Sequence, residues 1–171
     1  MTERVALFID GSNVFASAKA LGVEFDYKLL LKHFGKDVNL IRAYYYTAVI
    51  EGDEYSNIKP LIDWLDYNGY AVVTKPAKQY EQADGTVKTK GNMDIEMAVG
   101  MMKMAPNIDR AIVFTGDGDF RSAVEFVQDQ GVKVTVVSTM KSKPPMIADE
   151  LRRQADDFID LADLTAIKKK R

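Results

Sequence analysis

Two hydrophobic patterns alternate along the chain. Short segments that are apolar at nearly every position are typical of strands covered on both faces of a sheet. Segments with apolar residues every three or four positions are typical of helices that bury one face. Strands are expected at residues 4–10, 39–50, 70–77, 110–117 and 132–138, with a short strand or edge segment at 157–161. Helices are expected at residues 14–22, 26–35, 55–69, 92–105, 120–131 and 145–155. This alternation predicts an α/β domain built around a mostly parallel sheet.

Polar and glycine positions mark where these elements begin and end. Asp26 is expected to cap the second helix and Gly35 to end it. From Lys75 to Gly91 the pattern is polar, and Asp84-Gly85 predicts the tip of a hairpin. The methionine-rich face of the helix at 92–105 is interpreted as core packing, because methionine readily fills irregular core gaps.

Length and composition restrict the class of protein. With 171 residues and no linker or internal repeat, the chain is expected to form one domain. The absence of cysteine excludes disulfides, iron–sulfur clusters and thiolate zinc sites. No apolar run approaches the roughly 18 to 20 residues that cross a bilayer, and the start, MTERVALFIDGSN, is too short and too quickly polar for a signal peptide. A cytoplasmic protein without membrane contact is the expectation.

The basic residues are unevenly distributed. The net charge of −2 provides no overall attraction to nucleic acid. However, the chain ends in IKKKR, and Lys75, Lys78, Lys88 and Lys90 fall within one short stretch. Such runs are either solvated surface or contacts for an acidic ligand. We expect the stretch 75–90, with Tyr80, to project and guide nucleic acid.

Four aspartates follow or precede the predicted elements at one edge of the sheet. Asp10 ends the first strand, Asp117 and Asp119 follow the strand at 110–117, and Asp94 opens the methionine-rich helix. In open parallel sheets, ligands bind beyond the carboxyl ends of the strands, so these acids are expected to converge. Each also has a structural alternative, since Asp94 and Asp119 could be helix caps and Asp10 could form an Asx turn.

Convergence of several carboxylates favours a metal-dependent hydrolase. Crowded carboxylates repel one another unless a cation is present, and their hard oxygens suit Mg²⁺ or Mn²⁺. Two such ions roughly 3.5 to 4 Å apart activate water and stabilise the leaving oxygen at a phosphodiester, and one ion could do both less well. The chain has one histidine, His33, which is expected on a helix surface, and no cysteine. Nucleophilic catalysis by a serine–histidine or cysteine–histidine pair is therefore not favoured.

Four segments together resemble the NYN domain, specifically its bacterial LabA-like branch. They are FIDGSN, KGNMDIEMAVGMM, VFTGDGDFRSAVEFVQDQGVKVTVV and ELRRQADDFIDL, in this order, within about residues 4–163. The NYN domain is similar to PIN domains and to the flap endonuclease core. The resemblance implies a three-layer α/β/α sandwich over residues 1–164, followed by a basic tail at 165–171. It also implies a Mg²⁺- or Mn²⁺-dependent nuclease that acts mainly on RNA. We expect this nuclease to be an endoribonuclease.

The resemblance also implies roles for individual residues. The metal-binding and catalytic acids would be Asp10, Asp94, Asp117 and Asp119. Asn13 would orient a carboxylate or water, Thr115 would hydrogen-bond within the site or to phosphate, and Lys90 and Ser12 would contact phosphate.

The chain departs from the family pattern at one position. Many relatives have a further acid six residues beyond the helix aspartate, where this chain has Gly100. Glu96 does not replace it, because two residues along a helix turn the side chain by about 200°. Four acids are therefore expected, without two fully occupied metal sites.

The sequence is also compared with the motifs of three other functions. A non-catalytic RNA-binding or regulatory module would keep the fold and a metal-binding rim. A haloacid-dehalogenase-like phosphatase would need an aspartate two residues after Asp10, where Ser12 stands, and the phosphate-binding loop motif GxxxxGK[ST] is absent. RNA versus DNA preference and assembly as a homodimer stay open.

Overall fold

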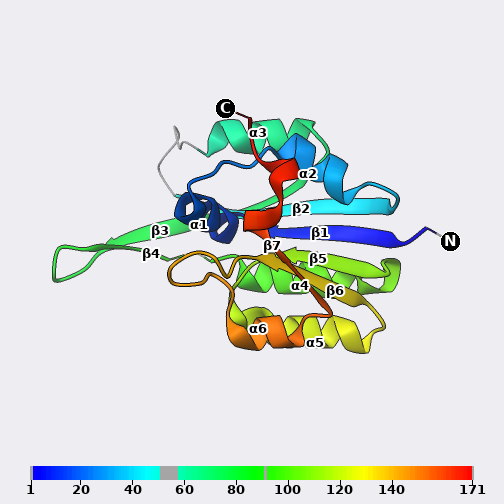
Figure 1. Cartoon of the computed structure of the whole chain (residues 1–171). Helices are drawn as coiled ribbons and strands as arrows, with labels where there is room; N and C mark the ends of the chain where they lie inside the picture. Colours follow the sequence, from blue (N-terminus) through cyan, green and yellow to red (C-terminus); the bar gives the residue numbers. More distant parts are fainter. Residues whose placement is uncertain (1, 51–57, 91, 171) are drawn as a thin grey trace.

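The computed structural model describes residues 2–50, 58–90 and 92–170 (Figure 1). Its sheet has seven strands in the order β4-β3-β2-β1-β5-β6-β7. Neighbouring strands are parallel, except that β4 runs antiparallel to β3. The strands are β1 Arg4–Asp10, β2 Asn39–Ile50, β3 Ala71–Glu81, β4 Val87–Lys90, β5 Arg110–Phe114, β6 Lys133–Ser138 and β7 Asp157–Asp160.

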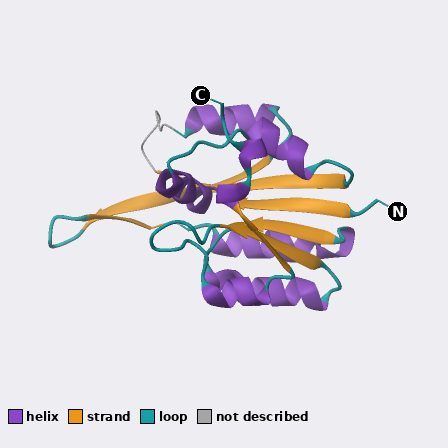
Figure 2. Cartoon of the chain, viewed as in Figure 1, coloured by secondary structure: helices purple, strands orange, loops and turns teal. Residues whose placement is uncertain are grey.

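Helices cover both faces of this sheet (Figures 1 and 2). The α-helices are α1 Gly11–Leu21, α2 Tyr27–Phe34, α3 Lys59–Tyr67, α4 Asp94–Met104, α5 Arg121–Asp129 and α6 Asp149–Gln154. Short 3₁₀ turns follow at η1 Ala105–Asn107, η2 Gly118–Phe120, η3 Leu161–Asp163 and η4 Thr165–Ile167. Helices α1 to α3 lie on one face and α4 to α6 on the other (Figure 2). The predicted mostly parallel α/β sandwich is confirmed.

The core consists of two apolar layers separated by the sheet. Strand β1 is buried from Val5 to Ile9, and its successive side chains point to opposite faces. Phe8 packs with Met97 of α4, whereas Leu7 packs with Leu30 of α2. The methionine-rich face of α4 is core, as predicted.

Strand β1 also marks the point where the order of strands reverses. The chain proceeds from β1 through β2 to β3 on one side, and then returns to place β5 on the other side of β1. At such a switch point the connections leave the sheet in opposite directions, and a crevice forms beyond the carboxyl ends of the strands. Asp10 is the last residue of β1, at this point of the sheet.

Several element boundaries differ from those expected. Helix α1 begins at Gly11 rather than Val14, because the side chain of Asp10 caps it. Helix α6 begins at Asp149 rather than near Pro145. Ala148, the residue before the helix, has an extended backbone with φ −73° and ψ 139°, and its N–H donates to the carbonyl of Gly116, so the helix cannot begin before it.

The polar stretch after β3 forms the expected hairpin. Strand β3 continues to Glu81, beyond its expected end at residue 77, and pairs with β4. The turn is closed by a hydrogen bond of 2.7 Å from Gln82 N to Thr86 O, and Gly85 has the positive φ of 85° that glycine adopts readily. The hairpin projects away from the body of the domain (Figure 1).

The C-terminal segment packs onto the domain. Ile167 is fully buried in the layer that contains α1 and α2. The backbone of the segment pairs with the turn before α2, through Asp26 N to Ile167 O at 2.7 Å and Lys169 N to Glu24 O at 2.9 Å. The expected boundary after residue 164 therefore does not coincide with an end of packing.

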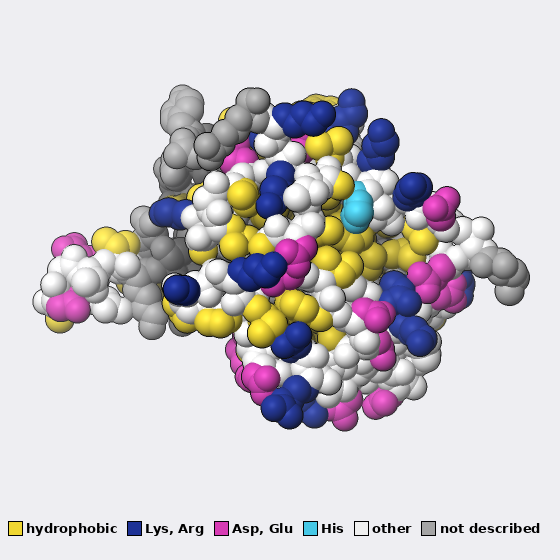
Figure 3. All heavy atoms as spheres, viewed as in Figure 1, with side chains coloured by type: hydrophobic (Ala, Val, Ile, Leu, Met, Phe, Trp, Pro, Cys, Tyr) yellow, Lys and Arg dark blue, Asp and Glu magenta, His cyan; other side chains and the backbone are white. Residues whose placement is uncertain are grey.

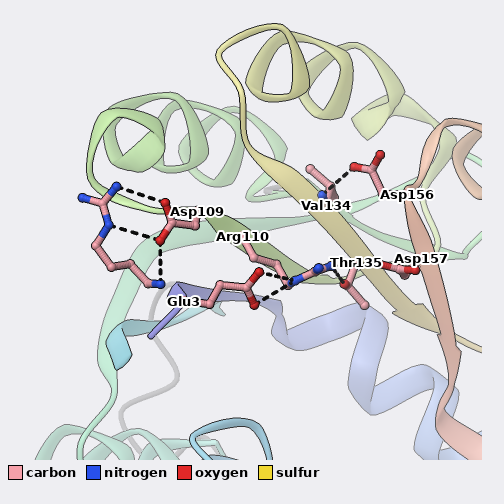
Figure 4. A network of polar contacts seen from close by, with 8 residues as sticks. Glu3, Asp109, Arg110, Val134, Thr135, Asp156 and Asp157 are labelled. Carbon is pink, nitrogen blue, oxygen red and sulfur yellow. Dashed lines mark hydrogen bonds and ion pairs between the residues drawn. The ribbon is translucent and has the colours of Figure 1, made fainter. Parts of the chain in front are cut away.

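Ion pairs join the strands at the amino edge of the sheet, opposite the crevice (Figure 4). Arg110 of β5 forms ion pairs with Glu3 at 3.1 Å and with Asp157 of β7 at 2.8 Å. The same guanidinium donates to the hydroxyl of Thr135 of β6. Glu3 and Asp157 at this edge thus share one cationic partner. In the described part of the chain, no helix is long and apolar enough to span a bilayer.

Candidate active site

The expected acids meet beyond the carboxyl ends of β1 and β5. Asp94 stands at the start of α4, and Asp117 and Asp119 lie in the loop between β5 and α5. One carboxylate oxygen from each of these three residues lies within 4.8 Å of those of the other two. The acids come from two distant segments of sequence, and the fold places them in one cluster.

Asp10 lies in the same cleft. A hollow of about 270 Å³ is lined by Asp10, Asp94 and Asp117, together with Asn92, Met93 and Met146. Asp119 belongs to the three-acid cluster at the exposed rim of this hollow. We refer to the hollow and its four aspartates as the acid cleft.

Hydrogen bonds fix the carboxylate of Asp10. Its Oδ1 accepts from the backbone N–H of Asn13 at 3.4 Å and from the hydroxyl of Ser12 at 3.2 Å. Its Oδ2 accepts from the buried hydroxyl of Thr115 at 3.2 Å. Asp10 therefore caps α1 and is also held by the loop after β5.

Thr115 and Asn13 join α1 to that loop. Thr115 Oγ1 accepts from the N–H of Asp117 at 3.2 Å, in addition to its bond to Asp10. The side-chain oxygen of Asn13 accepts from the N–H of Gly116 at 3.1 Å. Because Thr115 is fully buried, it bonds within the site and does not face a substrate.

The other expected cap positions are occupied differently. Asp117, and not Asp119, caps the turn η2, because its Oδ1 accepts from Asp119 N at 2.9 Å. Asp94 is the first residue of α4, and Met93 occupies the cap position without a side-chain hydrogen bond. Capping therefore accounts for Asp10 and Asp117 in part, and for neither Asp94 nor Asp119.

Two glycines allow the loop after β5 to lie against the segment before α6. A Cβ atom on Gly116 would stand 2.0 Å from the carbonyl oxygen of Met146. One on Gly118 would stand 2.2 Å from a carboxylate oxygen of Glu150. The N–H of Ala148 donates to the carbonyl of Gly116, which completes the contact. Close packing around the acids thus requires Gly116, whereas Gly118 leaves room for the side chain of Glu150.

The electrostatics of the cleft favour a bound cation. Burial, followed by the charges of Asp117 and Asp10, raises the pKa of Asp94 to about 6. Burial also raises the pKa of Asp10, against the opposing effect of its hydrogen bonds from Asn13 and Thr115. Among the described residues, no lysine or arginine forms an ion pair with any of the four acids. A divalent cation would supply the missing charge, and four carboxylates are the donors that Mg²⁺ and Mn²⁺ prefer.

The remaining predicted residues are placed as follows. Ser12 is exposed at the cleft, beside Asp10. The side chain of Lys90 lies outside the described part of the structure. Lys75 pairs with Glu96 at 3.0 Å, so this lysine is partly neutralised and Glu96 is held by a cation instead of joining the acids.

Gly100 is explained by packing against β2. A Cβ atom there would stand 2.2 Å from the hydroxyl oxygen of Tyr46. Tyr46 is buried beside β1, opposite Asp10 in the register. An acid at position 100 would thus require Tyr46 to move.

Sequence reasoning missed four residues that line the cleft, among them Asn92 and Met146. Asn92 precedes α4 and its side-chain oxygen accepts from Asp94 N at 3.3 Å. The sequence signal for Asn92 was its place two residues before the aspartate, a spacing typical of an Asx turn. Met146 reaches the cleft from the segment before α6, and no local pattern indicates this.

An α/β/α domain with an acid cluster at the switch point of its parallel sheet has the features of the PIN-like nuclease superfamily. The profile of one family in that superfamily, the NYN domain, matches residues 4–162. The chain belongs to the NYN domain family.

Two known proteins show the extent of the similarity. The chain is 34% identical to the low amplitude and bright protein LabA of Synechococcus elongatus, over 98% of this chain and 88% of that protein. A solved structure of a protein of unknown function from Vibrio parahaemolyticus superposes with a TM-score of 0.75 and 26% identity. That match covers 98% of this chain and 97% of the other.

Proposed function

We propose that this protein is a divalent-metal-dependent ribonuclease that hydrolyses phosphodiester bonds in the acid cleft. The observation that supports it best is the cluster of Asp94, Asp117 and Asp119, whose oxygens lie within 4.8 Å of one another and pair with no lysine or arginine that the structure describes. A purely structural cluster of this kind would cost stability. Membership of the NYN domain family, which is a family of nucleases, also supports this proposal.

Each acid has a distinct role in this proposal. Asp94, Asp117 and Asp119 would hold Mg²⁺ or Mn²⁺, and Asp10, which lines the same hollow, would complete the set. The bound ion would activate a water molecule and stabilise the charge on the leaving oxygen. Thr115 and Asn13 keep Asp10 and the loop of Asp117 in fixed positions, which limits reorganisation during the reaction. Ser12 and Lys90 remain the proposed phosphate contacts.

The test is cleavage of single-stranded RNA and DNA by the purified protein with Mg²⁺, Mn²⁺ or EDTA. We expect RNA to be cleaved with either metal and not with EDTA. Asp117→Asn and Asp10→Asn should each abolish cleavage. Asparagine keeps a side-chain oxygen for the N–H groups that both acids now bind, so the two variants should fold normally.

A second candidate is a non-catalytic RNA-binding module. It predicts that the wild-type protein binds RNA and metal without cleaving the RNA. Activity that persists equally in Asp117→Asn would come from a contaminating nuclease and would contradict the proposed ribonuclease.

A further inference from the structure

A second hollow lies at the other end of helix α1 from the acid cleft. Its volume is about 490 Å³, and its lining includes Lys19, Lys169 and Lys170, with Glu24 as the one acid. Lys19 comes from α1, and the other two lysines come from the C-terminal segment. We call this hollow the basic hollow.

The lysines of the basic hollow are positioned by the fold. Backbone hydrogen bonds join the C-terminal segment to residues 24–26, and the buried Ile167 anchors it. This docking brings Lys169 and Lys170 beside Lys19, although about 150 residues separate them in sequence. Lys169 Nζ lies 3.6 Å from Oε2 of Glu24, and because both groups are exposed this pair is weak. With three lysines and one acid in its lining, the hollow keeps a net positive charge.

The exposed side of α1 connects the two hollows. Ser12 and Ala16 line the acid cleft, and Lys19 lines the basic hollow. Seven residues of helix, about 10 Å along its axis, separate Ser12 from Lys19. Between them stands Phe15, whose side chain is 69% exposed. Phe15 lies three residues after Ser12 and four before Lys19, so these side chains share one side of the helix.

A ligand that spans both hollows needs anionic groups and flat apolar faces along one chain. Single-stranded nucleic acid offers both, since proteins bind it with cationic grooves for the backbone and aromatic side chains for the bases. The acid cleft repels phosphate, so cations near the cleft are needed to retain such a ligand. Lysine and arginine side chains (dark blue) are scattered over the face shown in Figure 3, which is viewed from the same side as Figure 1.

We propose that single-stranded nucleic acid runs along α1, with a backbone phosphate in the basic hollow and a base stacked on Phe15. The strand then enters the acid cleft, where the proposed ribonuclease acts. The proposal names the binding path of that same site and therefore rests on the proposed function, but it is tested by binding and not by cleavage.

The experiment measures fluorescence anisotropy of a labelled single strand of about 12 nucleotides, as RNA and as DNA of the same sequence. EDTA is present so that no metal-dependent cleavage occurs, and salt is varied from about 50 to 200 mM. The variants are the triple change Lys19→Ala, Lys169→Ala and Lys170→Ala, and the single changes Phe15→Ala and Phe15→Trp. The control triple replaces the exposed Lys36, Lys103 and Lys133, which lie at or before the amino ends of β2, β5 and β6.

The triple variant of the basic hollow should bind about tenfold or more weakly at low salt, and its log–log salt slope should fall by about 0.7, the contribution of the one phosphate contact in the hollow. Phe15→Ala should weaken binding by about 5- to 100-fold with an unchanged slope, and Phe15→Trp should restore it. The control triple variant should retain most of the affinity of the wild-type protein for the single strand. Equal binding of RNA and DNA supports the path and shows that it does not read the 2′-hydroxyl.

Three results would overturn the path: no binding by the wild-type protein, unaltered binding in the triple variant of the basic hollow, or equal losses in the two triple variants. The failure of the nuclease proposal gives a different pattern. Binding along α1 without cleavage in Mg²⁺ or Mn²⁺ upholds the path and contradicts the ribonuclease. Metal-dependent cleavage together with unaltered binding in the triple variant of the basic hollow supports the ribonuclease and contradicts the path.

Discussion

The carboxyl group of Asp94 differs from an ordinary surface acid because of its surroundings. It is partly buried at the start of α4, and the nearby carboxylates of Asp117, Asp10 and Asp119 disfavour its charged form. Its pKa of about 6 lies above the usual value of 3.8. Between these values the folded protein binds more protons than the unfolded chain. The fold is therefore more stable below about pH 4, where Asp94 is neutral in both states, and this extra stability is lost as the pH rises through 6.

Asp94→Asn is accordingly expected to stabilise the metal-free protein at pH 7 and to have little effect at pH 4. After allowance for solvent screening, the gain at pH 7 should be about 1 kcal/mol, or roughly 2 to 4 °C in Tm. Thermal unfolding in EDTA at the two pH values measures it. Asp129→Asn, a change of an exposed acid outside the cluster, is the control.

Adding Mn²⁺ at pH 7 should make the wild-type protein more stable than Asp94→Asn, because a ligand that binds only the folded state raises Tm. The wild-type protein should gain more than Asp94→Asn. A variant that is less stable than wild type in EDTA at pH 7 would show that Asp94 has a structural role that outweighs the repulsion.

At the scale of elements, the loop after β5 depends on its contact with the segment before α6. Gly116 and Gly118 both lie against this segment, but they meet different atoms. The atom nearest to a Cβ on Gly116 is a backbone oxygen of Met146, which cannot turn away. The one nearest to Gly118 is the carboxylate end of Glu150, an exposed side chain that can adopt another rotamer.

Gly116→Ala should therefore lower the free energy of unfolding by about 2 to 3 kcal/mol, and Gly118→Ala by under about 1 kcal/mol. Urea unfolding of the two variants measures the difference. Gly116→Ala should also reduce metal binding, because Asp117 follows it directly. Equal destabilisation in the two variants would mean that the segment before α6 moves freely and does not support the acids.

At the scale of the whole molecule, the β3–β4 hairpin projects from the body of the domain (Figure 1). Its tip contributes no residue to either core layer. The exposed Lys78 and Tyr80 lie on it, a short distance in sequence from α4 and Asp94. The hairpin was expected to guide nucleic acid, and this role remains a prediction.

A variant in which an Asn-Gly turn replaces residues 80–88 tests that role. Its free energy of unfolding should stay within about 0.5 kcal/mol of wild type, because no core residue is removed. Its affinity for single-stranded RNA should fall, and the salt slope should become shallower. Unchanged anisotropy curves would exclude the hairpin and leave α1 with the basic hollow as the path.

The sequence by itself predicted the fold class and indicated that the four acids would converge at one edge of the sheet. Hydrophobic periodicity reports which faces are buried, and β1, β2, β5, β6 and the helices between them follow it closely. The placement of Asp10 and Asp117 at strand ends followed from the same pattern, because parallel strands end at one edge. The motifs around these acids also identified the family.

Only the tertiary structure decided what each polar group contacts. The burial of Thr115 between Asp10 and Asp117, the pairing of Lys75 with Glu96, and the late start of α6 all depend on segments that are distant in sequence. The basic hollow depends in the same way on the docking of Ile167. Periodicity describes one element at a time, whereas hydrogen bonds and charge pairs depend on distances between elements, which are fixed only when the sheet and its helices pack together.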